Sequence, residues 1–174
     1  MSRMILDGAI VENDWRHLSA EEVDSGGIPE SGNITVPLAV WREHREALTE
    51  RSGGTGVWLE PGEEPEEIAD DLKHLDLVAI HFPAHKDGRG YSYARELRTR
   101  YGFTGEVRAV GDVLQDQLFY MHRVGFNGFE VREDRDIEEA LEGLKIFSVT
   151  YQGDVHDPRP LFRRVSAEQQ RQSA

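Results

Sequence analysis

The sequence predicts an α/β fold whose mainly parallel sheet is built from about five strand–helix units behind an N-terminal β-hairpin. Strand-like and helix-like segments alternate along most of the chain, which is typical of parallel strands joined by right-handed crossovers. The segment Leu77–Phe82 (L-V-A-I-H-F) is apolar apart from His81, as expected of a strand covered on both faces. The same alternation is compatible with an open sheet or with a partial (βα) barrel.

The first elements follow from local signals. Apolar residues flank Asp7-Gly8 in M-I-L-D-G-A-I-V, and this dipeptide favours a two-residue hairpin turn. The polar stretch from Asp14 to Gly32 is expected to be an irregular excursion. After it we expect a short strand at Ile34–Leu38 and a helix at Trp41–Arg51.

The later units have the same form, and proline, acidic residues and glycine mark their helix ends. Gly102 and Gly125 each follow a predicted helix. The expected strands are Gly56–Leu59, Leu77–Phe82, Glu106–Val110 and Gly128–Val131, and the expected helices are Pro65–His74, Tyr91–Tyr101, Val113–Val124 and Asp136–Ile146.

We expect a single α/β domain over residues 1–152. The stretch 153–174 contains two prolines and then the polar run R-R-V-S-A-E-Q-Q-R-Q-S-A. This composition favours a poorly ordered C-terminal tail.

Composition narrows the classes of function. The chain of 174 residues has 33 acidic and 20 basic side chains, a net charge of -13, which disfavours nucleic-acid binding. Such a surface serves solubility or, alternatively, docking to a basic partner. No apolar run reaches the ~18 residues of a membrane span, and residues 1–15 lack a signal-peptide pattern, so we expect a cytoplasmic protein that does not bind membranes. Cysteine is absent, which excludes thiol chemistry and cysteine-based metal sites.

The segment D-G-R-G-Y-S-Y-A-R is the first candidate binding site. It joins a strand to a helix, where backbone amides and arginine side chains suit an oxyanion such as carboxylate, sulfate or phosphate. Ser92 is the expected N-cap of the helix. The alternative is a tight glycine turn in which the acid pairs with one arginine. The candidate binding residues are Asp87, Gly88, Arg89, Gly90, Ser92 and Arg95.

The segment R-A-V-G-D-V-L-Q-D-Q adds Arg108, Asp112 and Gln117 as candidate binding residues. An arginine within a covered strand needs a charge partner, and we expect Arg108 to meet Glu130 or Asp112. A structural ion-pair network is favoured over catalysis here.

The sequence lacks the motifs that are typical of nucleotide binding, serine-dependent hydrolysis and metal binding. The chain has neither a Walker A loop nor the third glycine of G-x-G-x-x-G, and Ser92 is not in a G-x-S-x-G elbow. A metal triad of His81, His85 and Asp87 is disfavoured because the spacing matches no recognised ligand pattern. No metal site is predicted, and no cofactor or catalytic residue is identified.

Long ordered motifs nevertheless resemble one bacterial family, the domain-of-unknown-function family numbered 934. They include V-P-L-A-V-W, G-V-W-L-E-P, D-G-R-G-Y-S-Y-A-R-E-L-R, Y-G-F-T-G-E-V-R-A-V-G-D-V-L-Q-D-Q-L and R-V-G-F-N-G-F-E. Members are commonly encoded beside assimilatory sulfite reductase and sulfonucleotide reductase, and are labelled oxidoreductases of sulfite reduction for that reason. The family often has a cysteine where this chain has Val124, so a function retained here does not need that thiol.

The resemblance implies an accessory protein of assimilatory sulfate and sulfite reduction that acts with sulfite reductase and binds an oxyanion at strand ends. The alternative is an oxidoreductase that acts on a sulfur oxyanion or sulfonucleotide with an external reductant or cofactor. The residues leave open whether the protein is an enzyme.

Overall fold

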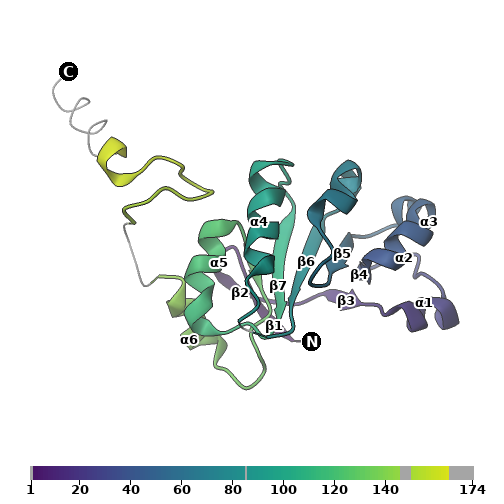
Figure 1. The fold of residues 1–174 in the computed structure, drawn as a ribbon. Helices are drawn as coiled ribbons and strands as arrows, with labels where there is room; N and C mark the ends of the chain where they lie inside the picture. The colour runs from purple at the N-terminus through teal and green to yellow at the C-terminus, as the bar shows by residue number, and fades with distance from the viewer. Residues whose placement is uncertain (1, 85, 146–149, 165–174) are drawn as a thin grey trace.

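A curled, mixed β-sheet organises the molecule. The structure, a computed structural model, describes residues 2–84, 86–145 and 150–164. Within them eight strands form one sheet in the order β2-β1-β8-β7-β6-β5-β4-β3, and the sheet bends into a half-barrel (Figure 1). The predicted α/β class, the mainly parallel sheet and the N-terminal hairpin are confirmed, and the sheet has the form of the partial-barrel alternative.

The parallel part of the sheet contains consecutive strands that lie side by side in chain order, like the staves of a barrel. These strands are β3 (Trp15–His17), β4 (Asn33–Pro37), β5 (Thr55–Leu59), β6 (Leu77–Phe82), β7 (Glu106–Gly111) and β8 (Gly128–Phe129). Because they are parallel, their carboxyl ends meet at one edge.

The hairpin closes the other end of the sheet. Its strands β1 (Arg3–Leu6) and β2 (Ala9–Glu12) pair antiparallel, and β1 also pairs antiparallel with β8. The turn residues Asp7 and Gly8 have φ angles of 49° and 77°, the left-handed conformation that a tight primed turn requires.

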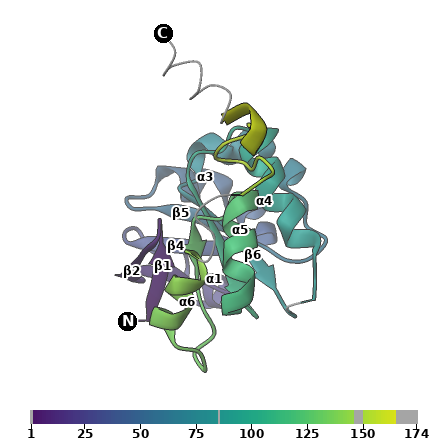
Figure 2. The ribbon, with the colours of Figure 1, turned by 90° about the vertical axis from the view of Figure 1, so that its left-hand side faces the viewer.

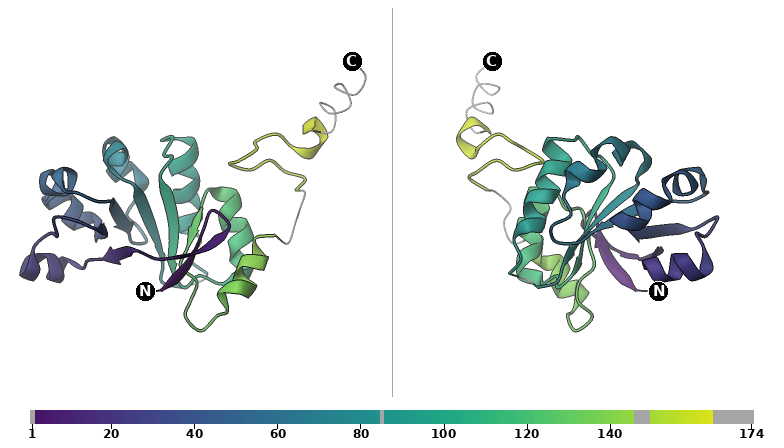
Figure 3. Two further views of the ribbon diagram at one scale, coloured as in Figure 1. Left: turned by 180° about the vertical axis from the view of Figure 1, so that it is seen from behind. Right: turned by 45° about the vertical axis from the view of Figure 1, so that its right-hand side comes forward.

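Helical segments follow each strand from β3 onward and pack mainly on the convex side (Figure 3). They are α1 (Ala20–Gly26), α2 (Leu38–Glu43), α3 (Arg45–Glu50), the 3₁₀ helix η1 (Pro65–His74), α4 (Arg89–Thr99), the 3₁₀ helix η2 (Gln115–Gln117), α5 (Leu118–Val124) and α6 (Ile137–Gly143).

Strand β6 shows how the two faces differ. Val78, Ile80 and Phe82 join the large core beneath the helices. The alternate residues Leu77 and Ala79 face the concave side, in a smaller cluster covered by Trp15 and Trp58. The prediction that this strand is covered on both faces is confirmed.

The prediction of irregular structure from Asp14 to Gly32 is wrong, because this stretch contains β3 and α1. Helix α1 begins with a capping box in which Glu22 N–H donates to Ser19 Oγ (3.2 Å) and Ser19 N–H donates to Glu22 Oε2 (2.9 Å). These two bonds satisfy backbone donors at a helix start.

Other helix boundaries also differ from the prediction. The helix expected at Trp41–Arg51 is divided into α2 and α3 at His44. Ser92 is not an N-cap, because α4 already begins at Arg89 and Gly88 occupies the cap. The helix expected at Val113–Val124 is the short η2 followed by α5, and the one expected at Asp136–Ile146 is α6, with Ile146 outside the described residues.

The C-terminal segment extends away from the sheet beside α4 and α5 (Figure 2). Val155 N–H donates to the carbonyl of Arg123 (3.1 Å) on α5. The predicted tail continues over residues 165–174, which lie outside the described part of the chain. None of the described helices has the length and apolar character needed to cross a membrane.

Candidate functional site

The concave face presents a group of polar and aromatic side chains toward the carboxyl ends of the parallel strands. Trp58, Ala79 and Arg108 lie in register across β5, β6 and β7. Because side chains alternate between the two faces of a strand, Glu60 and His81, two residues further on, lie on the same face as Trp58 and Ala79. In barrels of this kind ligand sites lie at the strand carboxyl ends. We call this group the concave rim; it consists of His17, Trp58, Glu60, His81, Arg108 and Glu130.

Arg108 is the buried cation of the concave rim, with 2% of its surface exposed. Its Nε donates to Glu106 Oε1 (2.6 Å), and its Nη1 donates to Glu130 Oε1 (2.9 Å) and Asn13 Oδ1 (3.1 Å). The prediction that Arg108 meets Glu130 or Asp112 is confirmed through Glu130, while Asp112 pairs with Arg132. Two carboxylates therefore neutralise this guanidinium, which reduces its attraction for an anion.

Glu60 joins His81 to Trp58. Its Oε2 lies 2.7 Å from His81 Nδ1, and its Oε1 accepts a hydrogen bond from Trp58 Nε1 (2.8 Å). Burial opposes ionisation of Glu60, but the bonds from His81 and Trp58 outweigh it and lower the pKa of the carboxyl. The ionised carboxylate thus fixes the imidazole tautomer and orientation, as in a histidine prepared for proton transfer.

Gly111 leaves space for the His81 ring. Its φ is 93°, and a Cβ there would lie 2.6 Å from His81 Cδ2. A residue with a side chain at this position would be strained and would displace the imidazole.

His17 lies on the other side of the Trp58 ring. The ring centroids of His17 and Trp58 are 4.3 Å apart, and those of Trp58 and His81 are 5.2 Å apart. His17 Nδ1 is 3.2 Å from Thr35 Oγ1. Partial burial lowers the pKa of His17 despite nearby carboxylates, so the ring is largely neutral at pH 7 and able to donate or accept a hydrogen bond.

The cavity at the concave rim is small, about 70 Å³. A water molecule takes up ~30 Å³ in the liquid, so the space suits roughly two or three water-sized groups. A nucleotide needs far more room, since small-molecule pockets are usually about 300–1,000 Å³. The rim can therefore hold a small ion or waters, or recognise a group presented by a partner.

The residues of the D-G-R-G turn lie at the start of α4. Asp87 accepts hydrogen bonds from Arg89 Nε (3.0 Å), Nη2 (2.7 Å) and backbone N–H (3.2 Å), and the Arg89 side chain is first among the causes that lower the pKa of this carboxyl. Gly88 is the cap position, and a Cβ on Gly90 would lie 2.6 Å from Phe82. This geometry agrees with the alternative of a tight glycine turn with an acid–arginine pair.

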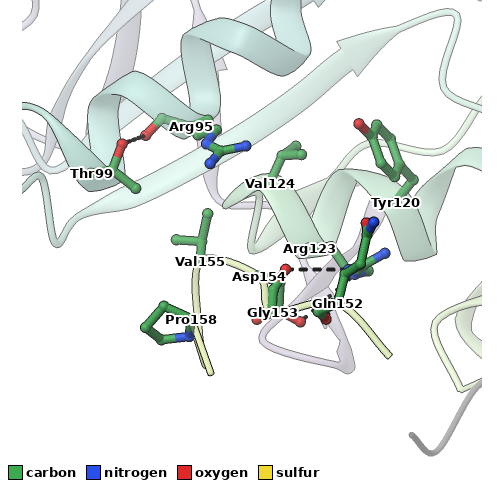
Figure 4. Close-up of a pocket in the computed structure, with 10 residues that line it drawn as sticks. All are labelled: Arg95, Thr99, Tyr120, Arg123, Val124, Gln152, Gly153, Asp154, Val155 and Pro158. Atoms are coloured by element: carbon green, nitrogen blue, oxygen red, sulfur yellow. Dashed lines mark hydrogen bonds and ion pairs between the residues drawn. The ribbon is translucent and has the colours of Figure 1, made fainter. Parts of the chain in front are cut away.

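The remaining predicted residues lie at other places. Arg95 faces an outer cleft beside α5 (Figure 4), and Ser92 is exposed within α4. Asp112 follows β7 and accepts from Arg132 Nη1 (2.8 Å), while Gln117 Oε1 accepts from Leu114 N–H (3.3 Å). The predicted site residues thus lie apart from one another, and only Arg108 belongs to the concave rim.

The disfavoured metal triad gains no support from the residues that can be described. His81 contacts Glu60 and Asp87 contacts Arg89, while His85 lies outside the described residues. Across residues 2–84, 86–145 and 150–164, no group of three or more histidine, aspartate and glutamate side chains is placed to hold a metal ion.

Sequence reasoning missed His17, Trp58 and Glu60. A usable signal was the segment G-V-W-L-E-P, where Trp58 and Glu60 are two residues apart at the end of a strand. Such spacing places both side chains on one face. His17 was missed because its segment was expected to be irregular.

Comparison with known sequences identifies the family. The profile described as "Bacterial protein of unknown function (DUF934)" matches residues 56–162, more than half of the chain. The chain belongs to this family. The match includes most of the concave rim of this DUF934 protein, from Trp58 to Glu130, and the outer cleft, whereas His17 precedes it. A comparison with curated proteins finds no match.

Proposed function

We propose that this DUF934 protein is an accessory protein of assimilatory sulfate and sulfite reduction that acts with sulfite reductase. The pathway comes from the family resemblance. The concave rim supports the role. Its cavity of about 70 Å³ is lined by His17, Trp58, Arg108 and Glu130 among others, and side chains of the rim are already bonded to one another. Such a preformed, shallow surface supports recognition better than turnover of a large substrate.

The sequence composition supports the same role. A chain without cysteine supplies no thiolate for redox chemistry or for cysteine ligation of a cluster. Electrons for sulfite reduction would thus come from the partner enzyme. The proposal places the protein in the cytoplasm with that enzyme, and its acidic surface would meet a basic one.

A small oxyanion at the strand ends remains part of the proposal. Arg108 is neutralised by Glu106 and Glu130, so the imidazole of His17, which lines the cavity, is the better donor. The anion would have to be of the size of sulfite or sulfate to enter the cavity.

Co-purification tests the accessory role. The tagged protein is expressed with sulfite reductase from the same organism and recovered at low and moderate salt, because interactions of exposed charges weaken as the Debye length falls. We expect sulfite reductase to be retained at low salt and to be reduced for the double variant His17→Ala/Glu60→Gln. Glu46→Gln, which changes an exposed acid on α3, is the matched control. Failure of sulfite reductase to co-purify with folded wild-type protein at low salt would overturn the proposal.

The Glu60–His81 pair favours a second candidate, an oxidoreductase acting on a sulfur oxyanion with an external reductant. A carboxylate-bound imidazole is suited to general acid–base catalysis. Purified protein is incubated with sulfite and reduced methyl viologen, and sulfite loss is followed. Turnover that is abolished by His81→Gln in a normally folded variant would replace the accessory role with this one.

A further inference from the structure

An outer cleft of about 480 Å³ lies between α4, α5 and the C-terminal segment (Figure 4). Arg95 and Thr99 enter it from α4, Tyr120 and Arg123 from α5, and Gln152 from the segment. This volume is within the range of about 300–1,000 Å³ that is usual for small-molecule sites. The cleft is on the helical side of the sheet and is separate from the concave rim, so a ligand there would not occupy the site of the proposed function.

The C-terminal wall of the cleft is attached to α5. Arg123 Nη2 donates to the carbonyl of Gln152 (3.2 Å), and His156 Nε2 is 2.9 Å from the carbonyl of His122. The rings of His122 and His156 stack with centroids 4.3 Å apart. Burial is the main cause that lowers the pKa of His122, and His156 adds to it, so the His122 ring is largely uncharged near pH 7.

Positively charged side chains outnumber acidic ones in the cleft. The exposed guanidinium of Arg95 makes no hydrogen bond or ion pair with any residue that the structure describes. Arg123 Nε is 3.7 Å from Asp154 Oδ2, beyond hydrogen-bond range, while Asp154 Oδ1 accepts from the backbone N–H groups of His156 and Asp157 (2.9 Å each). Two arginines against one acid leave a positive excess in a protein of net charge -13.

An aromatic and apolar surface lies beside these cations. Tyr120 is 55% exposed, and its ring centroid is 5.3 Å from that of Tyr91. Val124, Val155 and Pro158 complete the lining. A large exposed aromatic side chain at the mouth of a cleft is suited to contact with a planar ligand ring.

We infer that the outer cleft binds a phosphate or sulfate monoester with an aromatic body. The tetrahedral oxyanion matches the forked donors of Arg95, with Arg123 adding positive charge. The ring of the ligand contacts Tyr120 and the apolar lining. The Gln152 side-chain amide provides a hydrogen bond to a polar substituent.

Titration calorimetry with four probes tests this inference: phenyl phosphate, phenyl sulfate, inorganic phosphate and phenol. We expect wild-type protein to bind at least one ester more tightly than inorganic phosphate or phenol, and the two esters distinguish a phosphate from a sulfate ligand. Arg95→Gln should weaken ester binding about tenfold or more, because a charge-assisted bond is lost. It should leave the melting temperature unchanged, because Arg95 has no partner to lose among the described residues.

Arg100→Gln is the matched control, since Arg100 follows α4 and is paired with Glu66 and Glu96 at 3.6 and 3.7 Å outside the cleft lining. Unchanged affinity in this control supports the assignment. Absence of ester binding, equal affinity for inorganic phosphate, or equal affinity of wild type and Arg95→Gln would each overturn it.

Discussion

Replacing Arg108 with methionine should destabilise the protein strongly. The Arg108 side chain is 3% exposed and its partner Glu106 is 11% exposed. Glu130 is 38% exposed, so its carboxylate can regain water when the guanidinium is removed. Glu106 cannot, because its side chain packs on Gly128, where a Cβ would lie 2.3 Å from Glu106 Oε1. The cost therefore comes mainly from leaving the Glu106 carboxylate buried and unpaired.

The magnitude follows from this burial. Breaking a buried ion pair by removing one partner costs about 3–5 kcal/mol, a large part of a total stability of about 5–15 kcal/mol. Since about 1 kcal/mol changes the melting temperature by about 2–4 °C in a protein of this size, we expect a decrease of about 6–20 °C. The double variant Arg108→Met/Glu106→Gln should recover part of this loss, because it removes the unpaired charge.

Urea unfolding followed by circular dichroism measures these free energies. Arg100→Met is the control, because Arg100 is 57% exposed and its carboxylate partners are at 3.6 and 3.7 Å; such surface pairs contribute about 0–1 kcal/mol. A loss below about 1 kcal/mol for Arg108→Met, or no recovery in the double variant, would refute the reasoning that an uncompensated buried carboxylate dominates.

Three further predictions concern backbone space, pH and helix capping. Gly111→Ala should displace the His81 imidazole and so change the ¹⁵N signals of that ring. Gly102→Ala is the control, because Gly102 has a φ of 64° and no atom would lie within 4 Å of its Cβ, and it should leave the His81 signals unchanged. Equal spectra for wild type and Gly111→Ala would contradict the steric argument. Because the folded-state pKa of His122 is lowered, its contribution to stability is present above the unfolded pKa of about 6.5 and is lost as the pH falls below that value. The melting temperature should therefore decrease less between pH 7.5 and 5.5 in His122→Phe than in the wild type. The same decrease in both proteins would argue against this linkage. Ser19→Ala removes the cap of α1 and should cost about 0.5–2 kcal/mol in urea unfolding, while an unchanged midpoint would show that the cap contributes little.

The local sequence pattern was sufficient to predict much of the sheet. The apolar run Leu77–Phe82 and the alternation around Arg108 depend on neighbouring residues, so the strands and the Arg108–Glu130 pair could be predicted. The start of α1 was also readable, because Ser19 and Glu22 have the spacing of a capping box, but the surrounding polar residues concealed it. The choice between an open sheet and a half-barrel was not local, since curvature depends on how all strands pack together.

The concave rim was harder to predict for the same reason. Glu60 and His81 are 21 residues apart, and only the parallel register of β5 and β6 brings them together. His17 comes from an edge strand that pairs with β4 over three residues, too short for a clear periodic signal. Residue type alone therefore could not show that Trp58 lies between two histidines.

Arg95 and Arg108 illustrate why identical side chains have different uses in this fold. In the sequence both are donors near a strand or helix end. Within the sheet, however, the backbone supplies Glu106 from the same face of β7 and Glu130 from the end of β8, because a buried guanidinium without carboxylates would be too costly. On the surface of α4, Arg95 remains solvated without such partners, at little cost. An anion would therefore gain more from the arginine of the helix than from that of the sheet.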